Sequence, residues 1–179
     1  SMGDLDFSVS GWVYADTIEA GATVLSKGLG SQVEYRIVFH VSGGNRLRFL
    51  VHNASSGGDD ISTDPSVNPI NPGEWNFVVA WHDSVRDTIN IQANNGPVSS
   101  VGYTTGSHDS AQPLTVGSLA GTQCFLNGRV DEVGIWKKAL SAQERADLYN
   151  AGAGNAFHQD RHAFDVDSGH SLADSLTVY

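Results

Sequence analysis

Short runs in which apolar and polar residues alternate make up most of this chain. Successive side chains of a β-strand point to opposite faces of a sheet, so a two-residue repeat predicts strands with a buried face. Turn residues, among them many of the twenty glycines, separate the runs, as in an all-β sandwich. The pattern predicts strands at 7–14, 23–27, 74–82, 88–93, 114–117 and 128–136, and a hairpin over 35–52.

The first strand has apolar groups on both faces. Phe7, Val9 and Val13 share one face, and Trp12 and Tyr14 lie on the other. A strand of this kind is expected in the middle of its sheet. We therefore interpret Trp12 as a core residue rather than as a platform for a ligand.

The register of the hairpin at 35–52 follows from its apolar residues. A three-residue loop of Gly43, Gly44 and Asn45 places Phe39 opposite Phe49, whereas a two-residue loop places Phe39 opposite Arg48. Because a buried face specifies register strongly, the three-residue loop is preferred. Its opposite face then carries nitrogen-rich side chains, with His40 paired to Arg48 and with Arg36 paired to His52.

The strand at 128–136 leads directly into a helix. Alternation places Asp131 on the same face as Val133 and Ile135, so an acid lies on a face that otherwise looks buried,. Ser141 followed by Glu144 is the spacing of a capping box, and glycines after residue 151 end the helix,. In contrast, residues 53–73 show no strand pattern, and a loop of this length is functional or disordered in most compact domains.

Charge and size restrict the functional classes. Twenty acids against ten bases give a net charge of −10 in 179 residues. This charge repels phosphate backbones and anionic lipids, so we expect no nucleic-acid partner and no membrane insertion. The single cysteine, Cys124, cannot form an internal disulfide and is expected to be a small buried side chain,.

Four segments resemble one family in its own order. They are DFSVSGWVYAD, TVLSKG, GEWNFVVAWHD and GRVDEVGIWKKALSAQERADLYNAG. They resemble the LamG-like, concanavalin A-like lectin/glucanase domains, including the laminin G type 3-like repeats. The resemblance implies an all-β antiparallel jelly-roll sandwich with one short helix near 141–150, in a domain spanning residues 1–156. It also implies an extracellular, cell-surface or virion location. Since many functions share this fold, the fold alone does not determine the function.

Catalysis is not expected. A glycosidase needs paired carboxylates, and the related glucanases carry acids on alternate residues of one strand. None of the five glutamates (Glu19, Glu34, Glu74, Glu132 and Glu144) has an acid two residues away. We therefore expect a non-catalytic carbohydrate-recognition module. The alternatives are a structural or adhesion repeat that binds other proteins, including neighbouring repeats, and, third, a glycoside-active enzyme.

Asp131 is the candidate metal ligand. Related sandwich proteins commonly hold a structural calcium from the matching position, and calcium prefers oxygen ligands. The equally weighted alternative is that Asp131 caps a neighbouring backbone N–H without metal.

The candidate glycan-binding residues combine cationic and amide side chains. They are Arg36, His40, Arg48, His52, Asn90 and Gln92. The alternative for the first four is an ordinary solvated sheet face on which the arginines pair with surplus acids.

The final segment, residues 157–179, resembles the strand that opens a LamG-like repeat. We expect this segment to fill the vacant sheet edge that the missing opening strand would leave, either in its own sandwich or in that of a neighbour. The natural protein would then carry such repeats in tandem.

Overall fold

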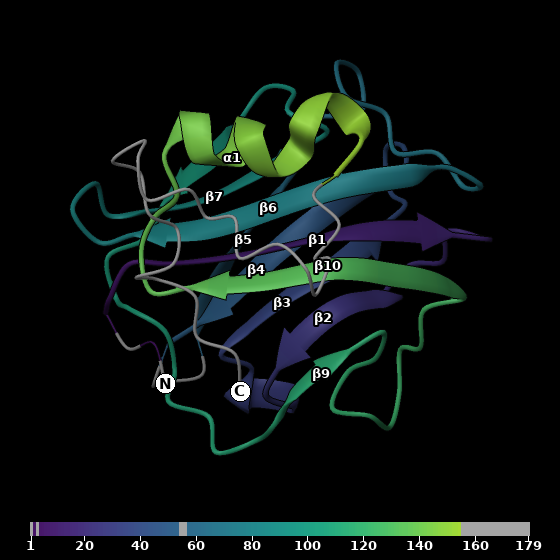
Figure 1. Ribbon diagram of the computed structural model, residues 1–179. Helices are drawn as coiled ribbons and strands as arrows, with labels where there is room; N and C mark the ends of the chain where they lie inside the picture. The colour runs from purple at the N-terminus through teal and green to yellow at the C-terminus, as the bar shows by residue number, and fades with distance from the viewer. Residues whose placement is uncertain (1, 3, 54–56, 155–179) are drawn as a thin grey trace, which may run out of the picture.

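Two five-stranded antiparallel sheets form the molecule in a computed structural model that describes residues 2, 4–53 and 57–154 (Figure 1). In sheet order, the first sheet, sheet A, comprises β10 (Gly128–Trp136), β1 (Phe7–Ala15), β6 (Trp75–Asp83), β7 (Thr88–Ala93) and β8 (Ser99–Gly102). The second, sheet B, comprises β5 (Gly58–Ser62), β4 (Arg46–His52), β3 (Tyr35–His40), β2 (Thr23–Lys27) and β9 (Leu114–Val116). The described helices are α1 (Ala142–Tyr149) and two short 3-10 turns, Gly30–Gln32 and Asn150–Gly152. The predicted all-β jelly-roll sandwich with one short helix is confirmed.

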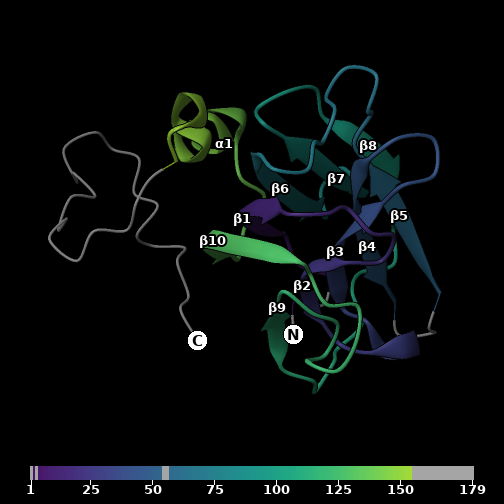
Figure 2. The same cartoon turned by 90° about the vertical axis from the view of Figure 1, so that its right-hand side faces the viewer.

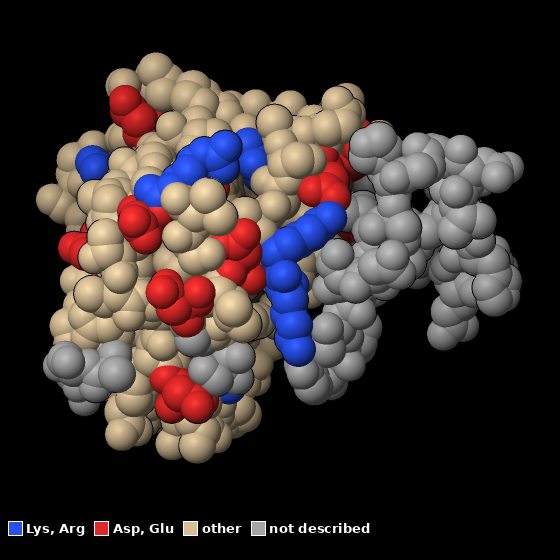
Figure 3. Space-filling model, turned by 90° about the vertical axis from the view of Figure 1, so that its left-hand side faces the viewer, with Lys and Arg blue, Asp and Glu red and all other residues tan. Residues whose placement is uncertain are grey.

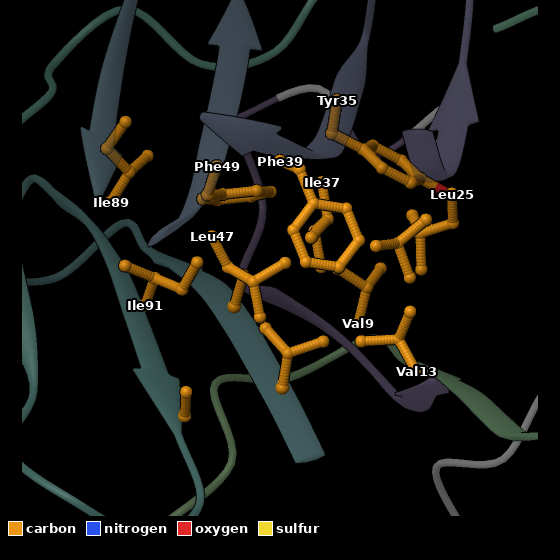
Figure 4. Close-up of a cluster of buried hydrophobic side chains, with 14 of the residues drawn as sticks. Val9, Val13, Leu25, Tyr35, Ile37, Phe39, Leu47, Phe49, Ile89 and Ile91 are labelled. Atoms are coloured by element: carbon orange, nitrogen blue, oxygen red, sulfur yellow. The ribbon is translucent and has the colours of Figure 1, made fainter. Parts of the chain in front are cut away.

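The main core lies between the two sheets. Both sheets contribute aromatic and branched side chains, and Phe7 packs at ring-centroid distances of 5.2 Å from Tyr35 and 6.3 Å from Phe49. Figure 4 shows the inward side chains of β3 and β4 meeting those of β1 and β7. β1 lies between β10 and β6, as its two apolar faces predicted.

A second apolar cluster covers the outer face of sheet A. The buried aromatic residues there are Trp12, Phe77, Trp81 and Trp136. Leu148 and Tyr149, the last two residues of α1, pack against them. Figure 2 shows α1 on the side of sheet A that faces away from sheet B. The helix therefore closes over this face, and Trp12 is a core residue, as predicted.

The helix begins where the sequence placed it. Ser141 Oγ accepts the backbone N–H of Glu144, and Glu144 accepts the backbone N–H of Ser141. This is the predicted capping box. Asn150 ends the helix in a left-handed conformation, with φ of 45°,.

The predicted register of the β3–β4 hairpin is wrong by two residues. Phe39 lies opposite Leu47, and His40 lies opposite Arg46, so the loop contains five residues. The pairs His40 with Arg48 and Arg36 with His52 therefore do not form. A two-residue shift leaves every side chain on the same face, so the apolar pattern could not choose between these registers.

Residues 53–73 are not free of strands, contrary to the prediction. Residues 58–62 form β5, which pairs with β4 and places Asp60 opposite Leu50. This strand is rich in Gly and Asp and mostly exposed, so it shows no apolar repeat. Its backbone is held by the edge of β4 rather than by burial of its own side chains.

The alternation predicted for β10 is also wrong, because a β-bulge interrupts it. Ser10 lies opposite Gly134 but Trp12 opposite Asp131, which leaves one extra residue on β10,. Val130 and Val133 both pack against the core. Asp131 is therefore exposed rather than on a buried face.

The predicted domain boundary at residue 156 and the segment 157–179 lie outside the described residues.

Candidate functional site

The outer face of sheet B carries the cationic residues predicted from sequence. Arg36, His40, Arg48 and His52 all lie there, because the residues between them point into the core. The revised register adds Arg46, directly opposite His40. We call these five residues the basic face.

Two of the arginines already have partners within the sheet. Arg36 donates to the Gly21 carbonyl at 2.6 Å and to Thr23 Oγ1 at 2.7 Å, which links β3 to the start of β2. Arg48 Nε lies 3.2 Å from Asp60 Oδ2, with 29% of the arginine side chain exposed. Arg48 thus pairs with an acid, as the alternative of a solvated sheet face predicts. Arg36 instead donates its hydrogen bonds to the chain around the start of β2.

Several nitrogen atoms of the basic face have no hydrogen-bond partner among the described residues. They are His40 Nδ1, Arg46 Nε, Arg48 Nε and His52 Nδ1, each inaccessible to solvent. The contact between Arg48 and Asp60 is an ion pair whose geometry is not that of a hydrogen bond. Four of the six buried side-chain atoms of this kind in the described part of the chain therefore lie on one face,.

Burial is the larger of two causes that lower the pKa of His52, and the charge of the neighbouring His108 is the smaller. The His108 backbone N–H donates to the His52 carbonyl at 2.6 Å, which holds the two residues together. The lowered pKa favours the neutral form of the His52 imidazole,.

The structure separates Asn90 and Gln92 from the basic face. Both side chains lie on the outer face of sheet A, where Asn90 is opposite Trp81. Gln92 Oε1 accepts a hydrogen bond of 2.7 Å from Arg145 Nε of α1, and Asn90 donates to Thr88 Oγ1 at 3.0 Å. The predicted six-residue glycan site is thus divided between opposite sides of the sandwich.

Asp131 lies in a pocket that sequence reasoning did not foresee. The pocket has a volume of about 220 Å³ and lies beyond the end of α1 on the outer face of sheet A. It is lined by Trp12, Trp75, Asp131, Glu132 and residues 152–154. Trp75 is 43% exposed, so an indole is open to a ligand there.

The bulge in β10 explains why two consecutive acids reach the same pocket. Glu132 has a φ of 49°, which is uncommon for a residue other than glycine,. Asp131 Oδ1 accepts the Glu132 backbone N–H at 2.8 Å, so Asp131 does cap a neighbouring backbone N–H. Bulges often re-aim side chains at functional sites.

Only the strand pairing could have revealed this pocket. Trp12 and Trp75 are 63 positions apart in the numbering and meet because β1 pairs with β6, which places Tyr14 opposite Trp75. The one available signal was the shared face of Trp12 and Tyr14 in the alternating pattern.

The described residues show neither a cluster of metal ligands nor a membrane-spanning helix. They contain no group of three or more His, Cys, Asp or Glu side chains that could hold a metal ion. No described helix is long and apolar enough to span a membrane. Figure 3 shows acidic and basic side chains interspersed on one face of the molecule, without a large patch of one sign.

Comparison with protein families identifies the class of this chain. Residues 1–144 match the model of the concanavalin A-like lectin/glucanases superfamily, and the chain belongs to that superfamily. A search of curated proteins finds no sequence match.

Solved structures with the same fold include sugar-binding modules. A CBM40 of the Ruminococcus gnavus IT-sialidase, solved with α2,3 sialyllactose, has a TM-score of 0.65 at 14% identity, over 82% of this chain and 83% of that one. A pentraxin from Limulus polyphemus has a TM-score of 0.64 at 16% identity, over 83% and 71%. A putative carbohydrate binding protein from Bacteroides ovatus has a TM-score of 0.60 at 15% identity, over 79% of this chain but 40% of that one. At these identities the likeness concerns the fold.

Proposed function

We propose that this protein is a non-catalytic carbohydrate-recognition module that works outside the cell and binds a glycan on its basic face. The observation that carries the proposal is the set of four buried nitrogen atoms on that face that have no hydrogen-bond partner among the described residues. Buried polar atoms are normally satisfied, so their concentration on one face points to a ligand that supplies partners. The sugar-binding modules among the structural neighbours support the same ligand class.

Glycan chemistry fits these groups. Imidazole nitrogens donate or accept according to tautomer, and a hydroxyl can do both. Arginine donates to carboxylates with suitable planar geometry. Leu50, between the cationic residues, adds half-buried apolar surface. The proposed ligand is therefore an acidic or densely hydroxylated glycan.

The first experiment is a glycan array, run with and without calcium, followed by calorimetry with the best ligand. The double variant His40→Ala with Arg48→Ala should weaken binding at least about tenfold, since charged hydrogen bonds are lost. Arg36→Ala is a poorer test, because Arg36 holds β2 and β3 together.

Arg86→Ala is the matched control. Arg86 lies on the turn between β6 and β7 and its side chain is 78% exposed. This variant should bind glycan normally. Wild-type affinity in the His40/Arg48 double variant, with an unchanged fold, would rule out the basic face as the site.

A further inference from the structure

The pocket beyond α1 combines an open aromatic surface with negative charge. Trp75 is held in place by an edge contact with Tyr14, at a centroid distance of 5.6 Å. Asp131 and Glu132 line the same pocket. It lies on sheet A, on the opposite side of the sandwich from the basic face, so it is a separate candidate site.

Trp12 contributes an unused hydrogen-bond donor to this pocket. Its side chain is 7% exposed, and its Nε1 atom is buried without a hydrogen-bond partner among the described residues. A Cβ atom added to Gly154 would lie 2.9 Å from Trp12 Nε1 and 2.9 Å from Glu132 Oε2. The indole N–H and the carboxylate therefore border the same small space beside Gly154.

Arg129, two residues before Asp131 on β10, contacts other groups. The Arg129 guanidinium lies 4.2 Å from the centre of the Tyr14 ring and 3.7 Å from Asp16. Asp131 takes part in none of the ion pairs found among the described residues. The pocket thus presents the Asp131 carboxylate beside an indole, an arrangement that favours a cation,.

We propose that this pocket binds an amino sugar through its protonated amine. The ammonium group would donate to Asp131, the sugar ring would lie against Trp75, and a sugar oxygen would accept the Trp12 indole N–H. At about 220 Å³, the pocket is smaller than the range of about 300–1,000 Å³ for drug-sized ligands. It therefore suits one sugar unit. The inference rests on the proposed function only in taking a sugar as the ligand class.

Four small probes test the chemistry of the pocket: glucosamine, glucose, N-acetylglucosamine and lysine amide. Binding is measured by NMR from the indole N–H signals of Trp12 and Trp75, in the presence of a chelator. Glucosamine should bind at least about tenfold more tightly than glucose or N-acetylglucosamine, because only glucosamine carries a positive charge. Its affinity should fall as salt is added. Equal affinity for the three sugars would overturn the role of the amine. Lysine amide binding as tightly as glucosamine would overturn the assignment to a sugar.

Two variants locate the site. Trp75→Ala and Asp131→Asn should each weaken glucosamine binding at least about fivefold. The matched controls are Phe125→Ala, which removes another exposed aromatic residue (62% exposed), and Asp87→Asn, which removes a remote acid. Both controls should bind as the wild type does. Wild-type affinity in both pocket variants would overturn the site.

Variants of the pocket and of the basic face separate the two proposed sites from each other. Trp75→Ala should leave binding to the basic face unchanged, and the His40/Arg48 double variant should leave glucosamine binding unchanged. Loss of glucosamine binding in the His40/Arg48 variant would place the amino sugar on the basic face and overturn the pocket as its site.

Discussion

At the scale of single residues, the most informative position is the pair Asp131 and Glu132. Glu132 adopts a left-handed backbone conformation that costs on the order of 1–3 kcal/mol in a residue other than glycine,. The cost coincides with two acids lining one pocket. Strain of this kind is common at functional sites, which agrees with a role for the pocket in binding.

The calcium prediction concerns Asp131. Asp131 would be the carboxylate ligand, with backbone carbonyls and water completing the oxygen shell. After chelation, added millimolar calcium should raise the melting temperature, because a ligand at 100 times its Kd stabilises the folded state by about 2.7 kcal/mol. A shift of about 5–10 °C is expected for a domain of this size.

Asp131→Asn keeps the shape of the side chain and removes its charge, so its melting temperature should not respond to calcium. Asp87→Asn, which is remote from the pocket, should respond as the wild type does. An unchanged melting temperature in the wild type would refute the calcium site.

At the scale of elements, α1 depends on tertiary contacts. Its eight residues are fewer than the roughly 12–15 that an isolated helix needs in water,. Arg145 holds it to sheet A, because its guanidinium lies 4.2 Å from the centre of the Trp81 ring and its Nε donates to Gln92. Tyr149 stacks on Trp12 at a centroid distance of 5.8 Å. The helix therefore also fixes one wall of the pocket.

Arg145→Ala should lower the free energy of unfolding by about 1.5–3 kcal/mol, since it removes charged hydrogen bonds and a cation–π contact. Urea unfolding measures the change. Gln143→Ala, at an exposed position of the same helix, should stay within about 0.5 kcal/mol of the wild type,. A wild-type stability for Arg145→Ala would show that the apolar contacts alone hold the helix.

At the scale of the whole molecule, one side of the sandwich is formed by two edge strands, β10 of sheet A and β9 of sheet B. In the described part of the chain, β10 pairs only with β1 and β9 only with β2. Nearby apolar side chains remain exposed: Val116 is 47% exposed and Phe125 is 62% exposed. Unpaired edges with apolar surface are sites for pairing with another strand.

Residues 157–179 remain the predicted occupant of this edge, in the same molecule or in a neighbour. Deleting them should lower the melting temperature strongly or cause precipitation, because a strand and its apolar contacts would be lost. Calorimetry and light scattering of the full and shortened chains measure this. A soluble shortened monomer with the full melting temperature would refute docking.

The sequence by itself determined much of the local structure and, outside β10, the inward-facing residues of the predicted strands. The alternating pattern placed Ile89 and Ile91 in the core, and Ser141 with Glu144 marked the start of the helix. Both signals act over a few residues, and burial or capping depends directly on those side chains. The cationic residues of the basic face were found for the same reason, because alternation places them together on the outward face.

Only the tertiary structure decided which distant side chains share a site. It moved Asn90 and Gln92 away from the basic face, since strand order in a sandwich depends on long-range pairing that alternation does not encode,. It chose the hairpin register, because registers two residues apart bury the same side chains,. It also turned Asp131 outward, since one extra residue in β10 reverses the alternation,. The pocket of Trp12, Trp75, Asp131 and Glu132 exists only because that bulge lies beside the β1–β6 pairing.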